Sequence, residues 1–181
     1  KGNLRLTNGR RLLSANTLSS RPTTSLIREA LTNIYSTQIK GSSWLDLFSG
    51  SGAISCEVLG KGANKVIAIE INKIIYQVCR KNITTIANAS TSNNHIQIIN
   101  TDCIKFLKKG FKSNRSFIDQ KFDFVYLDPP YASNLYLPVL ANLLTGNWLK
   151  NNAIVICELS SKTNFITPPN WQEADRREYG K

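Results

Sequence analysis

Residues 45–53 read Leu-Asp-Leu-Phe-Ser-Gly-Ser-Gly-Ala. This stretch begins inside an apolar run at 44–48 that is typical of a buried strand, and an apolar segment of helix length follows it. Gly50 and Gly52 allow the backbone to turn tightly and to approach a ligand closely. The stretch therefore predicts a strand, a ligand-binding loop and a helix, although a glycine pair alone fits an ordinary strand-turn-helix equally well.

The alternation of strand and helix continues along the chain. Short apolar runs at 66–69, 96–99, 122–127 and 153–157 alternate with helix-length segments such as 73–86 and 135–144, and the segments 87–95 and 110–121 are expected to be loops. Strands that alternate with helices form a parallel sheet covered on both faces. We expect an α/β, Rossmann-like fold with a mostly parallel twisted sheet, in which ligands bind beyond the carboxyl ends of the strands.

Acidic residues stand at two of these predicted strand ends. Glu70 ends the second strand, where a carboxylate can accept hydrogen bonds from ribose hydroxyls. A dinucleotide-binding fingerprint would have a third glycine at position 55, but Ser55 stands there. Asp46 lies in the first strand, ahead of the glycines. An acid at that point favours a cofactor with a cationic amino-acid part, such as S-adenosylmethionine, over a pyrophosphate.

The fourth strand ends in Asp128-Pro129-Pro130-Tyr131. The two prolines donate no backbone hydrogen bond and hold the chain stiff, so the Asp128 carboxylate and the Pro129 carbonyl can both act as acceptors. Two acceptors can bind the two hydrogens of an exocyclic amino group and leave its lone pair available to attack a methyl group. Tyr131 offers an aromatic face to an unstacked base. The alternative is a Pro-Pro turn that ends a strand, with Tyr131 in simple packing.

Charge and composition indicate a folded, basic protein. The chain has 181 residues, with Lys+Arg 23 against Asp+Glu 12 and a formal net charge of +11. Because 41% of its residues are hydrophobic, a disordered polycation is excluded. The positive excess implies a polyanionic partner, and nucleic acid comes ahead of an anionic membrane surface. Residues 1–28 carry six basic residues and no acidic one, so the charge is concentrated at the amino-terminal end.

This amino-terminal region predicts a hairpin and then a helix. Asn8-Gly9 readily adopts the positive φ angles of a tight turn, so the flanking segments 4–7 and 10–13 predict a small basic hairpin. Apolar residues between positions 26 and 35 recur at helical spacing, and a threonine before them can cap the helix. We expect residues 1–22 to form a basic arm and residues 23–181 to form the main domain.

Several other classes of protein are disfavoured. No apolar run approaches the roughly 18 residues of a membrane helix, and the start lacks the apolar core of a secretion signal, so we expect a soluble, cytoplasmic protein. We also expect it to be a monomer. His95 is the only histidine and is expected on a loop. The cysteines are widely spaced, which favours buried, reduced thiols over a zinc site or a disulfide framework: Cys56, Cys79, Cys103 and Cys157. Since the chain starts at Lys1 and contains no Met, we expect a preceding segment.

The motifs together resemble those of class I S-adenosylmethionine-dependent methyltransferases, and more narrowly the RsmD family of small-subunit (16S) ribosomal RNA guanine-N2 methyltransferases. The resemblance rests on Arg-Pro-Thr-Thr at 21–24, Arg-Glu-Ala-Leu-Thr-Asn at 28–33, the stretch 45–53, and Leu-Asp-Pro-Pro-Tyr at 127–131. Thr32 replaces a phenylalanine that is usual in the family, which is expected to loosen one edge of the cofactor pocket. The chain also ends at Lys181, where the family continues into a last strand.

The resemblance implies a role for each strand-end residue. The loop from Asp46 to Gly52 would hold the methionine part of S-adenosylmethionine, and it includes Phe48, Ser49 and Gly50. Glu70 would bind the ribose, and Asp102 with its neighbour Cys103 would contact the adenine. Asp102 could instead be a helix cap. No metal site is expected.

The resemblance also implies how the substrate is bound. Asp128, Pro129, Pro130 and Tyr131 would hold the target amine and its base, while phosphates of 16S ribosomal RNA, possibly in an assembling small subunit, would be bound by Arg10, Arg11, Arg21 and Thr23. Each of these basic side chains could instead be merely solvated. Two other functions stay open. One is methylation of adenine N6 in DNA or RNA, since the same Asp-Pro-Pro-Tyr motif occurs in DNA adenine methylases, and the other is non-catalytic RNA binding in ribosome assembly.

Overall fold

A five-stranded parallel sheet forms the centre of the computed structural model, which describes residues 4–14, 24–90, 93–113, 120–130, 133–161 and 163–179. The strand order is β3-β2-β1-β4-β5, and every neighbouring pair is parallel. The strands are β1 (Ser43–Asp46), β2 (Lys65–Glu70), β3 (His95–Asn100), β4 (Phe122–Leu127) and β5 (Leu149–Cys157). The predicted α/β fold with a parallel sheet is therefore confirmed.

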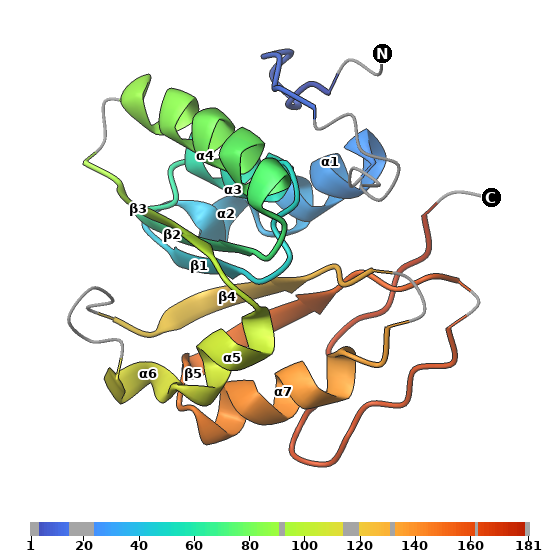
Figure 1. The fold of residues 1–181 in the computed structure, drawn as a ribbon. Helices are drawn as coiled ribbons and strands as arrows, with labels where there is room; N and C mark the ends of the chain where they lie inside the picture. Colours follow the sequence, from blue (N-terminus) through green and yellow to red (C-terminus); the bar gives the residue numbers. More distant parts are fainter. Residues whose placement is uncertain are drawn as a thin grey trace.

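Helices cover both faces of this sheet (Figure 1). One face carries α1 (Ser25–Ile34), α2 (Ser36–Ile39), α3 (Ala53–Gly60) and α4 (Lys73–Asn88), and the other carries α5 (Cys103–Lys108), α6 (Gly110–Ser113) and α7 (Tyr136–Thr145). Two hydrophobic cores separate the layers. Trp44 stacks on Phe124 in the first core, and Trp148 stacks on Phe106 in the second. Side chains of one strand alternate between these cores, which fixes the register of the sheet.

The predicted hairpin is present at the amino-terminal end. Leu6 N donates to Arg10 O at 2.9 Å, and Leu12 N donates to Leu4 O at 2.9 Å. Gly9 takes a φ of 83°, as the Asn-Gly turn predicts. The apolar side chain of Leu6 is buried in the core under α1, α3 and α4. The hairpin is thus packed on the domain, on the first face of the sheet.

Helix α1 begins where the sequence predicts. Thr24 caps it by accepting a hydrogen bond from Ile27 N at 3.3 Å. The buried face differs from the apolar pattern, however, because Leu26 is 50% exposed while Arg28 and Thr32 are buried with Leu31. The Thr32 hydroxyl donates to Glu29 O within the same helix. Arg28 is buried because α3 supplies its ionic partner, which no local pattern can reveal.

Three boundaries differ from the sequence-based expectation. β5 starts at Leu149, earlier than the apolar run 153–157, because Leu149 pairs with Phe122 before the irregularity that shifts the register of the β4–β5 pairing. His95 is the first residue of β3 and does not lie on a loop, since its backbone N–H bonds to Asn64 O. The predicted loop 110–121 opens with the short helix α6, because Phe111 is buried against Trp148. Residues 114–119 lie outside the described residues.

The segment after β5 runs back over the second face. Among its described residues, 158–161 and 163–179, none is in a helix or strand, and Phe165 and Trp171 pack against the core beneath α5 and α7. The four cysteines are free, and all but Cys157 are buried, as predicted. None of the helices in the described parts of the chain is long and apolar enough to cross a membrane.

Candidate active site at the carboxyl edge of the sheet

The parallel strands bring the predicted site residues to one edge of the sheet. Asp46 ends β1 and Glu70 ends β2, while Asp102 follows β3 and Asp128 follows β4. Asp46 pairs with Tyr126 across the β1–β4 boundary and with Ala68 across the β1–β2 boundary, so it lies deeper than Glu70 or Asp128. The order β3-β2-β1-β4-β5 reverses between β1 and β4, and such a reversal is where α/β sheets bind ligands.

The glycine-rich loop after β1 requires both glycines. Gly50 has a φ of 51° and Gly52 a φ of 79°, a region that residues with a side chain rarely adopt. A Cβ on Gly52 would lie 3.0 Å from Cys79 Sγ and 3.1 Å from Ile83 Cγ1. The loop is closed by hydrogen bonds from Gly52 N to Ser49 O and from Ser49 N to Ile69 O. Helix α4 therefore supports the loop from below and holds its backbone at the edge.

Asp46 is a buried carboxyl group with only one of its two oxygens hydrogen-bonded among the described residues. Its side chain is 2% exposed, and Oδ2 accepts a hydrogen bond from Ser55 Oγ at 2.7 Å. Oδ1 has no hydrogen-bond partner among the residues that the structure describes. Burial raises the pKa of Asp46 to about 7, and the nearby Glu70 charge adds to this while the Ser55 bond opposes it. A cationic ligand group would favour the ionised form, so the orphaned oxygen fits the amino-acid part of a cationic cofactor.

Ser55 acquires a role that the sequence did not indicate. In the sequence, Ser55 is notable only as a departure from a dinucleotide-binding fingerprint, which has glycine at this position. In the structure the Ser55 hydroxyl, fully buried on α3, holds the Asp46 carboxyl group in place. The signal that could have revealed it is helical geometry, since a residue in the first turn of the helix after the loop faces back toward the strand end.

Glu70 braces the glycine-rich loop. Its Oε2 accepts from Gly50 N at 2.9 Å, and its Oε1 accepts from Asn72 N at 2.8 Å. Burial raises the pKa of Glu70, and these backbone bonds oppose the rise. Each carboxylate oxygen can accept more than one hydrogen bond, so this bracing is compatible with the predicted contact to ribose hydroxyls.

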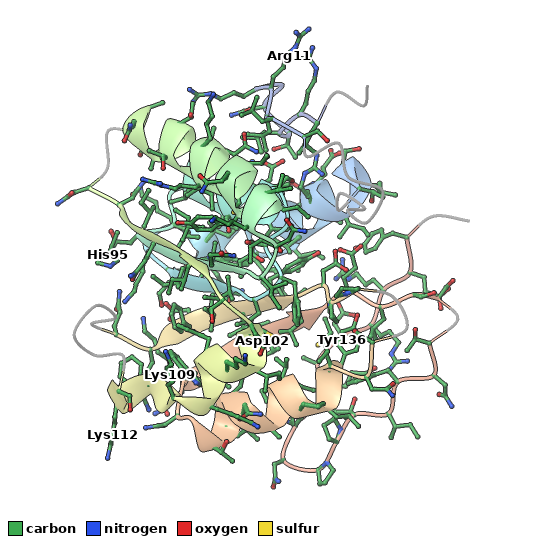
Figure 2. The ribbon with its side chains drawn as sticks, in the orientation of Figure 1. Arg11, His95, Asp102, Lys109, Lys112 and Tyr136 are labelled. Atoms are coloured by element: carbon green, nitrogen blue, oxygen red, sulfur yellow. The ribbon has the colours of Figure 1, made fainter. Side chains whose placement is uncertain are left out.

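Asp102 acts as a helix cap. Its Oδ1 accepts a hydrogen bond from Lys105 N at 2.8 Å, which caps the amino-terminal end of α5. This is the alternative that the sequence left open, and Figure 2 labels Asp102. Capping uses one oxygen and leaves the side chain at the carboxyl edge, so the predicted adenine contact is not contradicted. Cys103 is buried in the second core, and burial raises the pKa of its thiol to about 12. Cys103 is therefore a protonated packing residue, and its contact to adenine stays a prediction.

Hydrogen bonds join the strand end with the two prolines to the segment just after β5 and to the segment just before α7. Pro129 is buried and Pro130 is exposed, and Ser133 N donates to Pro130 O at 3.1 Å. Directly after the neighbouring strand β5, Glu158 N donates to Leu127 O at 2.8 Å. This hydrogen bond fixes the backbone directly before Asp128. Tyr131, the predicted aromatic support for the base, lies outside the described residues.

Glu158 is a further acidic residue at this edge, and sequence reasoning missed it. Tyr126 OH donates to Glu158 Oε2, and Tyr136 OH donates to the Glu158 backbone carbonyl. The two phenols come from β4 and from the first residue of α7, which Figure 2 labels. The available signal was its position, because Glu158 directly follows the fifth apolar run just as Glu70 ends the second.

The predicted RNA-binding residues fall into three groups. Arg10 and Arg11 are exposed on the hairpin, and Arg11 points away from the rest of the molecule in Figure 2. Arg21 and Thr23 lie outside the described residues. Arg28, the last of the six basic residues that concentrate the charge at 1–28, is buried, so it is not a phosphate contact. This part of the charge assignment is wrong, because a charged side chain can be buried when a partner compensates it.

The partner of Arg28 is Glu57 of α3, which sequence reasoning also missed. Arg28 Nε lies 3.4 Å from Glu57 Oε1, and Arg28 Nη2 donates to Arg5 O at 2.6 Å. Glu57 also accepts from Thr7 N and from Thr7 Oγ1, both at 2.8 Å. The hairpin is therefore hydrogen-bonded to α3, the helix that starts at the glycine-rich loop. In the sequence, Glu57 could have been recognised as the one acidic residue in the mainly apolar helix that follows the glycine-rich loop.

A hollow of about 300 Å³ lies at the opposite edge of the sheet. Asp123 and Lys150 line it and form an ion pair with a 2.8 Å distance between Lys150 Nζ and Asp123 Oδ2. Asp123 also accepts from Ser43 N and Ser43 Oγ, at the amino ends of β1 and β4. None of the predicted site residues lines this hollow, so we place the site at the carboxyl edge.

Comparison with known proteins finds one matching family and several similar methyltransferases. The family described as Conserved hypothetical protein 95 matches residues 5–181. Ribosomal RNA small subunit methyltransferase D of Haemophilus influenzae is 35% identical over 163 residues, which cover 90% of this chain and 80% of that protein. The enzyme of the same name from Buchnera aphidicola subsp. Baizongia pistaciae is 40% identical over 157 residues, 86% of this chain and 74% of that protein. The solved structure of a candidate methyltransferase from Escherichia coli aligns with a TM-score of 0.79 and 27% identity, over 99% of this chain and 93% of that chain.

Proposed function

Because the chain belongs to the Conserved hypothetical protein 95 family, we infer that it is a ribosomal RNA methyltransferase of the small subunit. The predicted resemblance to the RsmD family is confirmed, and so is the predicted class I methyltransferase fold. We propose in addition that the methyl donor is S-adenosylmethionine and that the acceptor is the N2 amino group of a guanine in 16S ribosomal RNA.

One observation in particular supports S-adenosylmethionine as the proposed cofactor. The Asp46 carboxyl group is buried beside a loop of two positive-φ glycines, and one of its oxygens has no partner among the described residues. Leaving a buried polar oxygen unpaired is costly, so a cationic ligand group in that position would stabilise the site. The loop from Asp46 to Gly52 would bind the methionine part, Glu70 the ribose, and Asp102 with Cys103 the adenine.

The proposed chemistry depends on orientation. When bound, the cofactor supplies a methyl group on a sulfonium, which is an electrophile that needs no further activation. The Asp128 carboxylate and the Pro129 carbonyl accept the two hydrogens of the guanine amino group, and Tyr131 supports the base. With the cofactor bound, the nitrogen lone pair would be free to take up that methyl group, and the amine would lose a proton to Asp128 or to water. Holding two reactants in line supplies much of the acceleration.

Incubation with radiolabelled S-adenosylmethionine tests this function. Small ribosomal subunits, naked 16S ribosomal RNA and duplex DNA serve as acceptors, and nuclease digestion with mass analysis identifies the labelled nucleoside. We expect label on N2-methylguanine of the ribosomal RNA. Label on adenine of DNA and none on ribosomal RNA would refute the proposal in favour of adenine-N6 methylation.

Asp128→Ala separates catalysis from folding. We expect methylation to fall to background in this variant while its thermal midpoint stays near that of the wild type, because residue 128 follows the strand and is only partly buried. A wild-type rate from Asp128→Ala would remove the residue from the reaction. Failure of the unmodified protein to bind S-adenosylmethionine in calorimetry would instead favour a non-catalytic RNA-binding protein.

A further inference from the structure

Glu158 lies at the carboxyl edge beside the strand end that carries Asp128. It directly follows β5, and the pairing of β4 with β5 ends at Leu127 and Cys157. The Glu158 N–H continues this ladder by donating to Leu127 O at 2.8 Å. Glu158 is therefore the next residue in register with Asp128 across the sheet, yet the proposed reaction gives it no role.

Two phenols from opposite faces of the sheet meet at Glu158. Tyr126 of β4 belongs to the first core and is 2% exposed, and its hydroxyl donates to Glu158 Oε2. Tyr136, the first residue of α7, packs on the second core and on the ring of Phe165, and its hydroxyl donates to the Glu158 backbone carbonyl. Figure 2 labels Tyr136 on the side of the molecule away from His95, which starts β3 at the opposite edge. Glu158 thus joins the two layers at the carboxyl edge.

These contacts anchor the chain on both sides of the Asp-Pro-Pro end of β4. Leu127, directly before Asp128, is held through its carbonyl, and α7, which follows this strand end, is held through the hydroxyl of Tyr136. The two prolines have no N–H group with which to fix their own stretch of backbone. The direction of this strand end therefore depends on the anchors before and after it, and both anchors bond to Glu158.

Packing alone does not require the hydroxyl of Tyr126. Phe124 lies on the same strand and in the same core, where it packs without a polar atom to satisfy. At Tyr126 a donor is placed deep in that core instead, and a buried phenol needs an acceptor. The Glu158 carboxylate supplies it, so the pair restrains the side chain of Glu158 as well as its backbone.

We propose that Glu158 is a positioning residue of the methyl transfer, which holds the Asp-Pro-Pro end of β4 in the direction that receives the target amino group. This inference rests on the proposed function. Asp46 and Glu70 end other strands, so Glu158 acts on the acceptor half of the site and leaves the cofactor half in place. Since a displacement of about 1 Å can cost about 100-fold in rate, loss of these anchors should lower kcat.

The kinetic test changes one hydrogen bond from each side. Glu158→Ala removes the acceptor, Tyr126→Phe removes the donor, and Glu158→Gln keeps an acceptor oxygen. Tyr35→Phe is the matched control, because Tyr35 packs on β4 through Phe124 while its hydroxyl bonds to none of the described residues. With the RNA that the wild type methylates, we expect kcat to fall about 10- to 100-fold in Glu158→Ala and in Tyr126→Phe, with both KM values changed less than about twofold.

The remaining variants separate positioning from other roles. Glu158→Gln and Tyr35→Phe should stay close to the wild-type rate, and Tyr126→Phe/Glu158→Ala should be no slower than either single variant, because both remove the same bond. A wild-type kcat from Glu158→Ala overturns the inference. So does a joint loss of cofactor affinity and thermal midpoint, since the residue would then support the whole fold. An equally slow Glu158→Gln also overturns it, because the charge and not the hydrogen bond would be required.

Amide hydrogen exchange tests the anchors without turnover. Ser133 N–H bonds to Pro130 O between the two anchored points, and it should exchange severalfold faster in Glu158→Ala and in Tyr136→Phe. Unchanged exchange at Ser133 in both variants overturns the inference, whatever the activity of the wild type. Faster exchange, together with a wild type that methylates no ribosomal RNA, supports the anchors and shows that the proposed function has failed instead.

Discussion

At the scale of single residues, Asp46 makes the stability of the ligand-free protein depend on pH. Its pKa is raised to about 7 in the fold by burial, against about 3.9 in an unfolded chain. The folded state therefore binds this proton more tightly, and the resulting stabilisation is present below about pH 4 and is lost as the pH rises through 7.

The variant Asp46→Asn should lack this dependence. Relative to the wild type, its free energy of unfolding should increase by roughly a few kcal/mol between pH 4 and pH 8, because the wild type must ionise a buried group and the variant does not. Urea denaturation at both pH values measures the difference. The control is Asp123→Asn at the opposite edge, where hydrogen bonds from Lys150 and Ser43 outweigh burial and lower the carboxyl pKa. Its pH dependence therefore lies below about pH 4, and this variant should parallel the wild type between pH 4 and pH 8. Parallel pH profiles for the wild type and Asp46→Asn would contradict the burial argument.

Substitutions at three glycines can distinguish the effect of backbone strain on stability from the effect of steric crowding. Gly52 has a positive φ and no room for a Cβ, Gly50 has a positive φ with no atom within 4 Å, and Gly60 has open space and no positive φ. We expect Gly52→Ala to lower the free energy of unfolding by about 2 to 4 kcal/mol, Gly50→Ala by about 1 kcal/mol, and Gly60→Ala by almost nothing. Denaturant midpoints give the order. If Gly50→Ala and Gly52→Ala cost the same, contact with Cys79 and Ile83 is unimportant.

Residues of the site differed in how far the sequence could predict them. Asp46, Glu70 and Asp128 were identified because each marks the end of an apolar run, and a parallel sheet brings such ends together. Ser55 and Glu57 were missed because their importance lies in partners distant in sequence: one holds Asp46, and the other holds Arg28 and Thr7. A local sequence pattern shows where an apolar run ends, but it does not show which distant residue a side chain contacts.

At the scale of elements, one buried ion pair joins the hairpin, α1 and α3. Arg28 and Glu57 have side chains that are each 3% exposed, so removing one partner leaves a buried charge uncompensated. We expect Glu57→Leu to destabilise the protein by about 3 to 5 kcal/mol and the double variant Arg28→Met/Glu57→Leu to be less destabilised than the single one. Thermal and urea denaturation test the order.

The same variants should also release the hairpin, since Thr7 loses the carboxylate that accepts both of its hydrogen bonds. Amide hydrogen exchange at Thr7 and Leu6 should become faster in both. Unchanged protection at these amides would show that Leu6 packing alone holds the hairpin.

Elements were easiest to predict where local chemistry dominates. The Asn8-Gly9 turn and the Thr24 cap appear as expected because backbone conformation decides them. The start of β5 and the helix α6 were not predicted. Polar Asn151 and Asn152 lie in an edge strand next to the unpaired side of the sheet, and α6 exists because Phe111 finds room against Trp148.

At the scale of the whole molecule, charge is separated by depth. The acids proposed to bind the cofactor lie at the carboxyl edge and include the buried Asp46, whereas exposed basic side chains are spread over the surface, with Arg10 and Arg11 on the hairpin among them. Salt screens exposed charges far more than buried ones. We therefore expect the affinity for 16S ribosomal RNA to fall by orders of magnitude between 50 and 200 mM salt, while the affinity for S-adenosylmethionine changes less than about twofold. Anisotropy and calorimetry over one salt series measure both, and equal salt dependence would mean that cofactor and RNA share one exposed surface.

The strand order also sets when the site can form during synthesis. β1 pairs with β4, and Ser43 N bonds to an Asp123 carboxylate 80 residues further along the chain. Until that segment leaves the ribosome, one side of β1 is an unsatisfied edge for roughly 4 to 16 seconds at ordinary translation rates. The edge where β1 meets β4 is therefore assembled late, after the glycine-rich loop and Glu70 have been synthesised. All the residues proposed to bind the cofactor are thus synthesised before the residues after β4 that are proposed to hold the base.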